Sequence, residues 1–195
     1  MNISKPSDAE YIGLNAVVNH KGFRNDGSMD YGRQINELLK DTLGHYKDTY
    51  HRMATGVRRF EYGPKINPEA IAETGRLLAF CKVHNITVLA FLPPFGDAVY
   101  RKMTASGRYG YMREIIPAIR PLFEKSGFEL YDFSTAASIG SNDSETLDGF
   151  HGGEATDIRI LIRMLESGSS LNKAANYKKL KADLKNWVNR YRVYR

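Results

Sequence analysis

An acid and a histidine stand three residues apart, at Asp148 and His151, in the stretch 146–156. Gly152 and Gly153 follow, and an apolar pattern typical of a helix begins soon after them, so we expect the pair on a turn that leads into a helix. A carboxylate that bonds one imidazole nitrogen fixes the tautomer and stabilises the protonated ring. The other nitrogen can then act as a general base toward a hydroxyl or a water. Asp148 and His151 are therefore the candidate catalytic acid and base.

The same spacing also suits a surface pair that only decorates the start of a helix. A catalytic triad needs a nucleophile as well, and several serines lie near the pair in sequence, although none follows a recognisable strand-to-helix elbow. These candidate nucleophiles are Ser134, Ser138, Ser141 and Ser144. We predict no metal site and no cofactor, because the five histidines show no pairwise ligand spacing and the carboxylates do not cluster with them.

The elements around the pair alternate between helix and strand. Residues 85–94 form the clearest strand, which is continuously apolar, as in a parallel sheet covered by helices on both faces. Residues 128–133 form a second short strand. This rhythm predicts an α/β fold with a mostly parallel sheet. Helices are predicted at residues 33–53, 67–84 and 111–125, from residue 95 onward, and after residue 153.

Ligand sites in such sheets lie at the carboxyl ends of the strands. Pro94, Phe95 and Tyr100 follow the first strand, so we expect them to bind substrate in the crevice that also receives the acid and histidine. The polar loop over residues 20–32 is either a further binding element or a surface excursion without a role. Within it, Arg24 is a fourth candidate substrate-binding residue.

Length and composition indicate globular material, with 195 residues, of which 42% are hydrophobic and 26% charged. Cys81 is the single cysteine and lies in an apolar helical stretch, so it is expected to be a buried structural thiol. No run approaches the ~20 apolar residues of a membrane span, and the first residues lack the apolar core of a signal peptide. We therefore expect a soluble, cytoplasmic chain.

The basic charge of the chain is concentrated at its C-terminus. The net charge is +6, and residues 171–195 contain eight Lys or Arg and one Asp, which is +7 and leaves −1 for the rest. We predict two parts, an α/β domain over residues 1–168 and a basic helical tail over 169–195. The tail's lysines and arginines are read as a solvated face, and nucleic-acid binding is not expected. Its predicted packing stripe consists of Leu180, Leu184, Trp187, Val188 and Tyr191.

Three stretches together resemble the C-terminal half of SGNH/GDSL-type hydrolases: Phe91–Phe95, Gly127–Phe133 and, above all, Asp148-Gly-Phe-His151. The resemblance covers residues 8–165 and implies a partial three-layer α/β/α sandwich, similar to flavodoxin. It also implies that Asp148 orients His151 and that His151 is the general base. The reaction implied is hydrolysis of ester bonds in lipids or carbohydrates, including O-acetyl groups of surface polysaccharides in some branches.

The superfamily's Gly-Asp-Ser nucleophile block does not occur in this sequence. Gly140-Ser-Asn-Asp143 matches its Gly-x-Asn-Asp pattern but lies too close to Asp148, so we predict a turn there. An acid and a histidine without a positioned hydroxyl and oxyanion donors lose most of their catalytic power. We therefore expect the C-terminal portion of a longer hydrolase, weak or inactive by itself, whose serine comes from an upstream segment or a partner chain.

Two other functions stay open. One is a non-catalytic α/β module that binds a carbohydrate or a protein through the crevice and the Gly22–Gly32 loop. The other is an anionic-polymer binder that acts through the basic tail and shows steeply salt-dependent binding. The partial fold would also leave sheet edges unpaired, which favours a homodimer.

Overall fold

The computed structural model describes residues 18, 21–23, 29–32, 35 and 46–194, and the chain divides into two compact units, Met1–His45 and Tyr46–Arg195. In the first unit, the two-residue strands β1 (Gly22–Phe23) and β2 (Met29–Asp30) pair antiparallel. Arg24 and most of the helix predicted over residues 33–53 lie outside the described residues. The proposed boundary at residue 168 stays a prediction.

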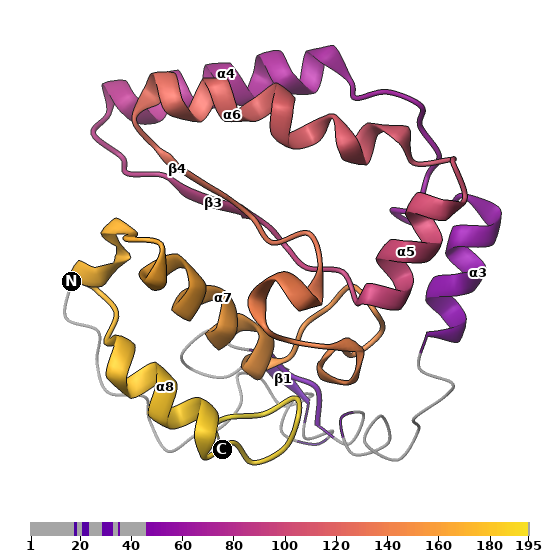
Figure 1. Cartoon of the computed structure of the whole chain (residues 1–195), viewed down its shortest axis with the longest axis vertical. Coiled ribbons are helices and arrows are strands. Elements are labelled where there is room, and N and C mark those ends of the chain that lie inside the picture. Colours follow the sequence, from indigo (N-terminus) through magenta and orange to yellow (C-terminus); the bar gives the residue numbers. More distant parts are fainter. Residues whose placement is uncertain (1–17, 19–20, 24–28, 33–34, 36–45, 195) are drawn as a thin grey trace. The chain divides into compact units, whose positions relative to one another are not determined.

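The second unit alternates helix and strand, which makes it a mixed α/β structure (Figure 1). Short 3-10 turns connect several of its elements: η1 (Gly110–Arg113), η2 (Ala136–Ile139), η3 (Asp143–Glu145) and η4 (Ser170–Lys173). Its regular elements, in chain order, are α3 (Lys47–Thr55), α4 (Pro68–Val83), β3 (Leu89–Leu92), α5 (Asp97–Ala105), α6 (Ile115–Ser126), β4 (Glu129–Asp132), α7 (Glu154–Glu166) and α8 (Tyr177–Lys185).

Local sequence signals explain where the predicted helices begin and end. The Asn67 side chain accepts a hydrogen bond from the Glu69 N–H at 2.9 Å, and Pro68 occupies the first helical position, so α4 begins where the sequence predicts. Gly127 ends α6 in the left-handed conformation, with φ of 73°. Cys81 is buried on α4, as predicted.

The sheet at the centre of this unit has two parallel strands among the described residues. β3 pairs with β4 from Leu89↔Glu129 to Leu92↔Asp132. On one face, Leu89 and Tyr131 pack against the buried side of α7, while α6 runs beside β4 and packs on α4 (Figure 1). The predicted coverage of both faces is incomplete, because Phe91 of β3 remains 40% exposed. Pairing through the open sheet edges stays a prediction.

The C-terminal segment departs from the long helix predicted from residue 171. The helix α8 ends at Lys185 because Asn189 starts a turn, in which its side chain accepts from the Tyr191 N–H at 2.9 Å. The prediction that Trp187 and Val188 belong to the packing stripe is therefore wrong, and these residues are 39% and 54% exposed. Leu180 and Leu184 do pack against α7, and Tyr191 is buried.

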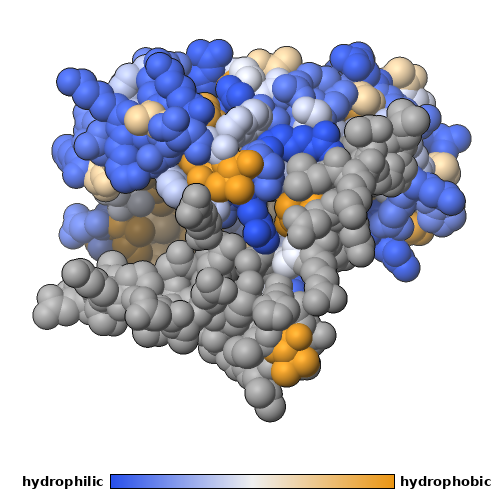
Figure 2. Space-filling model, turned by 90° about the horizontal axis from the view of Figure 1, so that it is seen from below, coloured by the Kyte–Doolittle hydropathy of each residue, from blue (hydrophilic) through white to orange (hydrophobic). Residues whose placement is uncertain are grey.

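The described surface is mainly hydrophilic on the face drawn in Figure 2, where hydrophobic residues gather only in small, separate groups. Larger exposed apolar side chains occur along α4, at Leu77, Phe80 and Val83. No helix in the described part of the chain has the length and apolar character required to cross a membrane.

Candidate functional site

Asp148 and His151 lie on the loop between η3 and α7, and their side chains are hydrogen-bonded. Nδ1 of the His151 ring is 2.8 Å from Oδ2 of Asp148. The other carboxylate oxygen, Oδ1, accepts from the backbone N–H of His151 at 2.9 Å and of Phe150 at 3.2 Å. The carboxylate therefore has three donors from within its own loop, and these bonds fix the position of the ring.

The charge state of Asp148 follows from these contacts. Burial alone would raise the pKa of Asp148, but the hydrogen bonds from the His151 ring, the His151 N–H and the Phe150 N–H outweigh it and lower this pKa below its ordinary value. An ionised carboxylate only accepts hydrogen bonds, so the neutral ring of His151 must carry its proton on Nδ1. The unprotonated Nε2 is then the atom that can receive a proton.

The His151 side chain is 49% exposed, and its Nε2 has no hydrogen-bond partner within the described part of the chain. The His151 ring also contacts the Phe150 ring, whose centroid is 4.1 Å away. Geometry of this kind, an imidazole held at Nδ1 and open at Nε2, is what a general base requires.

The loop that carries the pair is tied to two other elements. The Thr49 hydroxyl of α3 donates to the Asp148 carbonyl at 2.7 Å, and the Gly96 N–H donates to the Gly149 carbonyl at 2.7 Å. Gly149 has φ of +91°, and a Cβ there would lie 2.5 Å from Val99 Cγ2, so only glycine fits. The segments that follow β3 and β4 are thus bound to each other, as predicted for the carboxyl ends of parallel strands.

Phe150 anchors the loop in a cluster of aromatic rings. Its ring packs edge-to-face on Phe60, with centroids 5.3 Å apart, and Phe60 packs in turn on Phe95 at 6.4 Å. The Arg52 guanidinium lies 5.7 Å from the Phe150 centroid. This anchoring connects His151, through its neighbour in sequence, to the segment after β3.

Comparisons of the chain with known proteins identify no similar protein. No match was found in a scan against protein-family models, in a search of curated proteins or in a search of solved structures. The chemical interpretation of the pair therefore rests on its own geometry.

Glu145 holds the segment before the pair, and the sequence gives no signal for it. Its side chain is 2% exposed and forms two hydrogen bonds of 2.8 Å with the Arg159 guanidinium of α7. The Ser141 hydroxyl donates to the same carboxylate at 2.7 Å, and the Glu145 carbonyl accepts from Gly153 and Thr156. A buried bidentate pair of this kind fixes the loop against the start of α7.

The candidate serines are all engaged in local structure. Ser134 donates to Asp132, Ser138 to the Thr135 carbonyl at 2.6 Å and Ser144 to Asn142 at 2.6 Å. Ser141 is buried against Glu145. None of these four hydroxyls bonds the His151 ring. The geometry therefore brings none of the predicted nucleophiles to the predicted base.

Two of the four predicted substrate-binding residues, Phe95 and Tyr100, meet at a cavity of about 190 Å³ beside the carboxyl ends of β3 and β4. Phe95, Tyr100 and Ser134 line it, whereas Pro94 is buried next to it and does not. Asp148 and His151 are not among its described lining residues, so this cavity does not include the acid and the histidine that were expected to share a crevice with Phe95 and Tyr100. Leu92, Met103 and Tyr111 also line the cavity. Nothing in the sequence predicted that Tyr111 would lie there.

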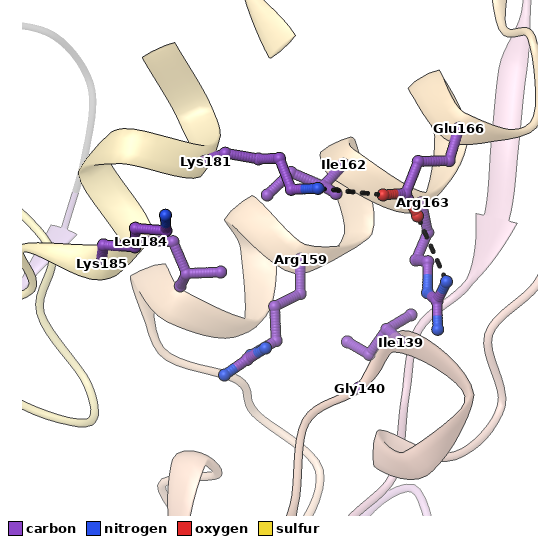
Figure 3. A pocket seen from close by; sticks show the side chains of 9 residues that line it. All are labelled: Ile139, Gly140, Arg159, Ile162, Arg163, Glu166, Lys181, Leu184 and Lys185. Carbon is purple, nitrogen blue, oxygen red and sulfur yellow. Dashed lines mark hydrogen bonds and ion pairs between the residues drawn. The ribbon is translucent and has the colours of Figure 1, made fainter. Parts of the chain in front are cut away.

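A second hollow, of about 290 Å³, lies between α7 and α8 (Figure 3). Four cations line it, and Glu166 supplies the carboxylate, paired with Arg163 at 3.2 Å and with Lys181 at 3.7 Å. Lys185 has no ion-pair partner in the described residues. Among those same residues, no group of three or more His, Cys, Asp or Glu is placed to hold a metal ion.

Proposed function

We propose that this chain supplies the acid and the base of an SGNH-type ester hydrolase, with Asp148 orienting His151 and His151 acting as the general base. The observation that carries the proposal is the 2.8 Å bond between His151 Nδ1 and Asp148 Oδ2, beside an Nε2 that is open. Helices on both sides of the parallel pair β3–β4 support the partial three-layer sandwich that such a hydrolase would have.

The alternative of a pair that only decorates a helix start explains less of the geometry. A decorative pair needs no tether from a distant element, yet the Thr49 hydroxyl and the Gly96 N–H both bind carbonyls of this loop. A decorative pair also does not need the packing of the Phe150 ring on Phe60. Two tethers and an anchor hold the ring orientation that proton transfer depends on.

In the proposed reaction, a serine hydroxyl attacks the ester carbonyl while His151 Nε2 takes its proton. The tetrahedral intermediate expels the alcohol, which receives that proton from Nε2, and a water repeats the cycle on the acyl-enzyme. Asp148 stays ionised and stabilises the protonated ring. Because no described serine hydroxyl bonds His151, the nucleophile and the oxyanion donors would come from an upstream segment or a partner chain.

The test is hydrolysis of 4-nitrophenyl acetate, an activated ester that an accessible imidazole attacks without help from serine. We expect slow hydrolysis that is largely lost in His151→Ala and also reduced in Asp148→Asn, because the amide no longer fixes the ring tautomer as the carboxylate does. His51→Ala is the matched control, because His51 is also exposed but has no carboxylate on its ring among the described residues, so its loss should lower the rate much less than His151→Ala does. A rate that His151→Ala leaves unaltered would refute the proposal.

A second candidate function is binding of anionic polymers through the hollow between α7 and α8. The observation in its favour is the set of cations in Figure 3, of which Lys185 lacks a carboxylate partner in the described residues. We expect binding to a heparin column that weakens steeply with salt and is reduced in Lys185→Ala. Retention equal to that of an exposed-lysine control, Lys65→Ala, would count against this function.

A further inference from the structure

The cavity beside the carboxyl ends of β3 and β4 is apolar in its chemistry. The described residues of its wall present mainly aliphatic, thioether and aromatic groups, with phenol hydroxyls at Tyr100 and Tyr111 and no charged side chain. Ser134 has the single aliphatic hydroxyl of the wall, and that hydroxyl already donates to Asp132. A sugar ring in this cavity would leave most of its hydroxyls without hydrogen-bond partners, and each such hydroxyl would weaken the free energy of binding. The lining therefore selects against carbohydrate.

The size of the cavity limits what can enter. Its volume of about 190 Å³ exceeds the roughly 150 Å³ of an apolar cavity that stays dry and binds benzene. A hydrocarbon chain on the order of seven carbons, which is the chain of octanoate beyond its carboxylate, or one aromatic ring fits that space. Each methylene that moves from water into such a site should tighten binding about fourfold.

The cavity also has a physical connection to the acid-histidine loop. Phe95 lines the cavity with one part of its ring and packs on Phe60, which packs on Phe150 beside His151. The next residue, Gly96, donates its N–H to Gly149. A ligand that moves Phe95 would therefore act on the same packed group that holds the base.

We infer that this cavity binds the hydrocarbon chain of an acyl group, so that the substrate class is a medium-chain acyl ester and not an O-acetylated sugar. The naming of the ligand as an acyl group rests on the proposed hydrolase function. The binding itself depends only on the lining and volume of the cavity, and it can be measured on a chain that has no turnover.

Two methionines in the wall, Met103 and Met112, provide the probes. In the full chain labelled with ¹³C-methyl methionine, butyrate, hexanoate and octanoate should shift both methyl signals saturably, with Kd falling about fourfold per methylene. The methyl of Met164, which lies on α7 in a different hydrophobic cluster, should not move. N-acetylglucosamine at the same concentrations should give no shift.

Ile115→Trp fills the cavity and should abolish the octanoate shifts, whereas the same substitution at Ile86, which is 48% exposed, should preserve them. If Ile115→Trp fails to fold, Met112→Trp blocks the cavity with Met103 as the remaining probe. Absence of binding in the unmodified chain, binding that survives the filled cavity, or an equal response to N-acetylglucosamine would overturn the inference.

The two proposals fail separately in these experiments. Loss of octanoate binding together with His151-dependent hydrolysis of 4-nitrophenyl acetate would overturn the acyl pocket alone. Saturable methyl shifts together with hydrolysis that does not depend on His151 would support the pocket and overturn the hydrolase assignment.

Discussion

His151 and the candidate serines all have side chains that can take part in proton transfer, but their hydrogen bonding within the structure differs. The Nε2 atom of His151 has no described partner, while its Nδ1 is held by Asp148. The hydroxyls of Ser138 and Ser141 are instead donated to a carbonyl and to the carboxylate of Glu145. A reactive side chain is therefore a candidate for chemistry only where an atom that can take or give a proton has no partner in the fold.

The largest effect is expected from the buried carboxylate that holds the loop. Glu145→Ala removes the buried carboxylate and leaves the Arg159 guanidinium, which is 25% exposed, without its partner, so we expect the free energy of unfolding to fall by about 3 kcal/mol. Urea denaturation measures this. Glu166→Ala is the matched control, because its pair with Arg163 is solvent-exposed and should be worth about 1 kcal/mol or less. Equal losses in the two variants would contradict the special role of Glu145.

An intermediate effect is expected at Glu129, whose carboxylate accepts from the Ser169 hydroxyl at 2.6 Å and from the Ser170 N–H at 2.8 Å. Burial raises the pKa of Glu129, but the bonds from Ser169, Ser170 and Tyr131 outweigh it and lower this pKa to about 2. A lowered carboxyl pKa adds stability that is complete above the ordinary value of 4.5 and is lost as the pH falls toward 2.

Glu129→Gln should therefore lower the free energy of unfolding by about 2 kcal/mol at pH 7, and by progressively less as the pH falls below about 4.5. Denaturant titrations of both proteins between pH 7 and pH 2.5 measure the difference. A difference that stays constant over this range would contradict the account of Ser169 as a structural hydroxyl that stabilises an ionised glutamate.

The smallest effects are expected at the exposed serines. Ser138→Ala and Ser144→Ala remove hydroxyls that bond locally at the surface, so we expect changes in unfolding free energy within about 0.5 kcal/mol and no change in ester hydrolysis. Intact mass after incubation with a fluorophosphonate adds a direct check. A stoichiometric adduct that disappears in either variant would identify that serine as an activated nucleophile and contradict the comparison.

Much of the fold followed from local signals in the sequence. The Asn67 cap, the Gly127 helix end and the continuous apolar run through Leu89–Leu92 each act over a few residues, so α4, α6 and β3 were predicted close to where they lie. The prediction of a helix in the tail was wrong beyond Lys185, because a turn at Asn189 overrides the helical spacing of the apolar residues.

The site was predictable only in part. The contact between Asp148 and His151 could be predicted because they are neighbours in sequence, and the position of Phe95 and Tyr100 because they follow a strand. Glu145 could not be found, since its importance depends on Arg159 being 14 residues away on α7 and on the burial of the Glu145 carboxylate. Long-range tethers of this kind, such as the Thr49 hydroxyl on the Asp148 carbonyl, leave no local pattern.

The most direct measurement of the central claim is the tautomer of the His151 ring, read from long-range ¹H–¹⁵N NMR correlations on the neutral form. The account predicts a proton on Nδ1 and a free lone pair on Nε2, with this preference lost in Asp148→Asn. A neutral ring that carries its proton on Nε2 in the unmodified chain would contradict the account, because that nitrogen could not serve as the base.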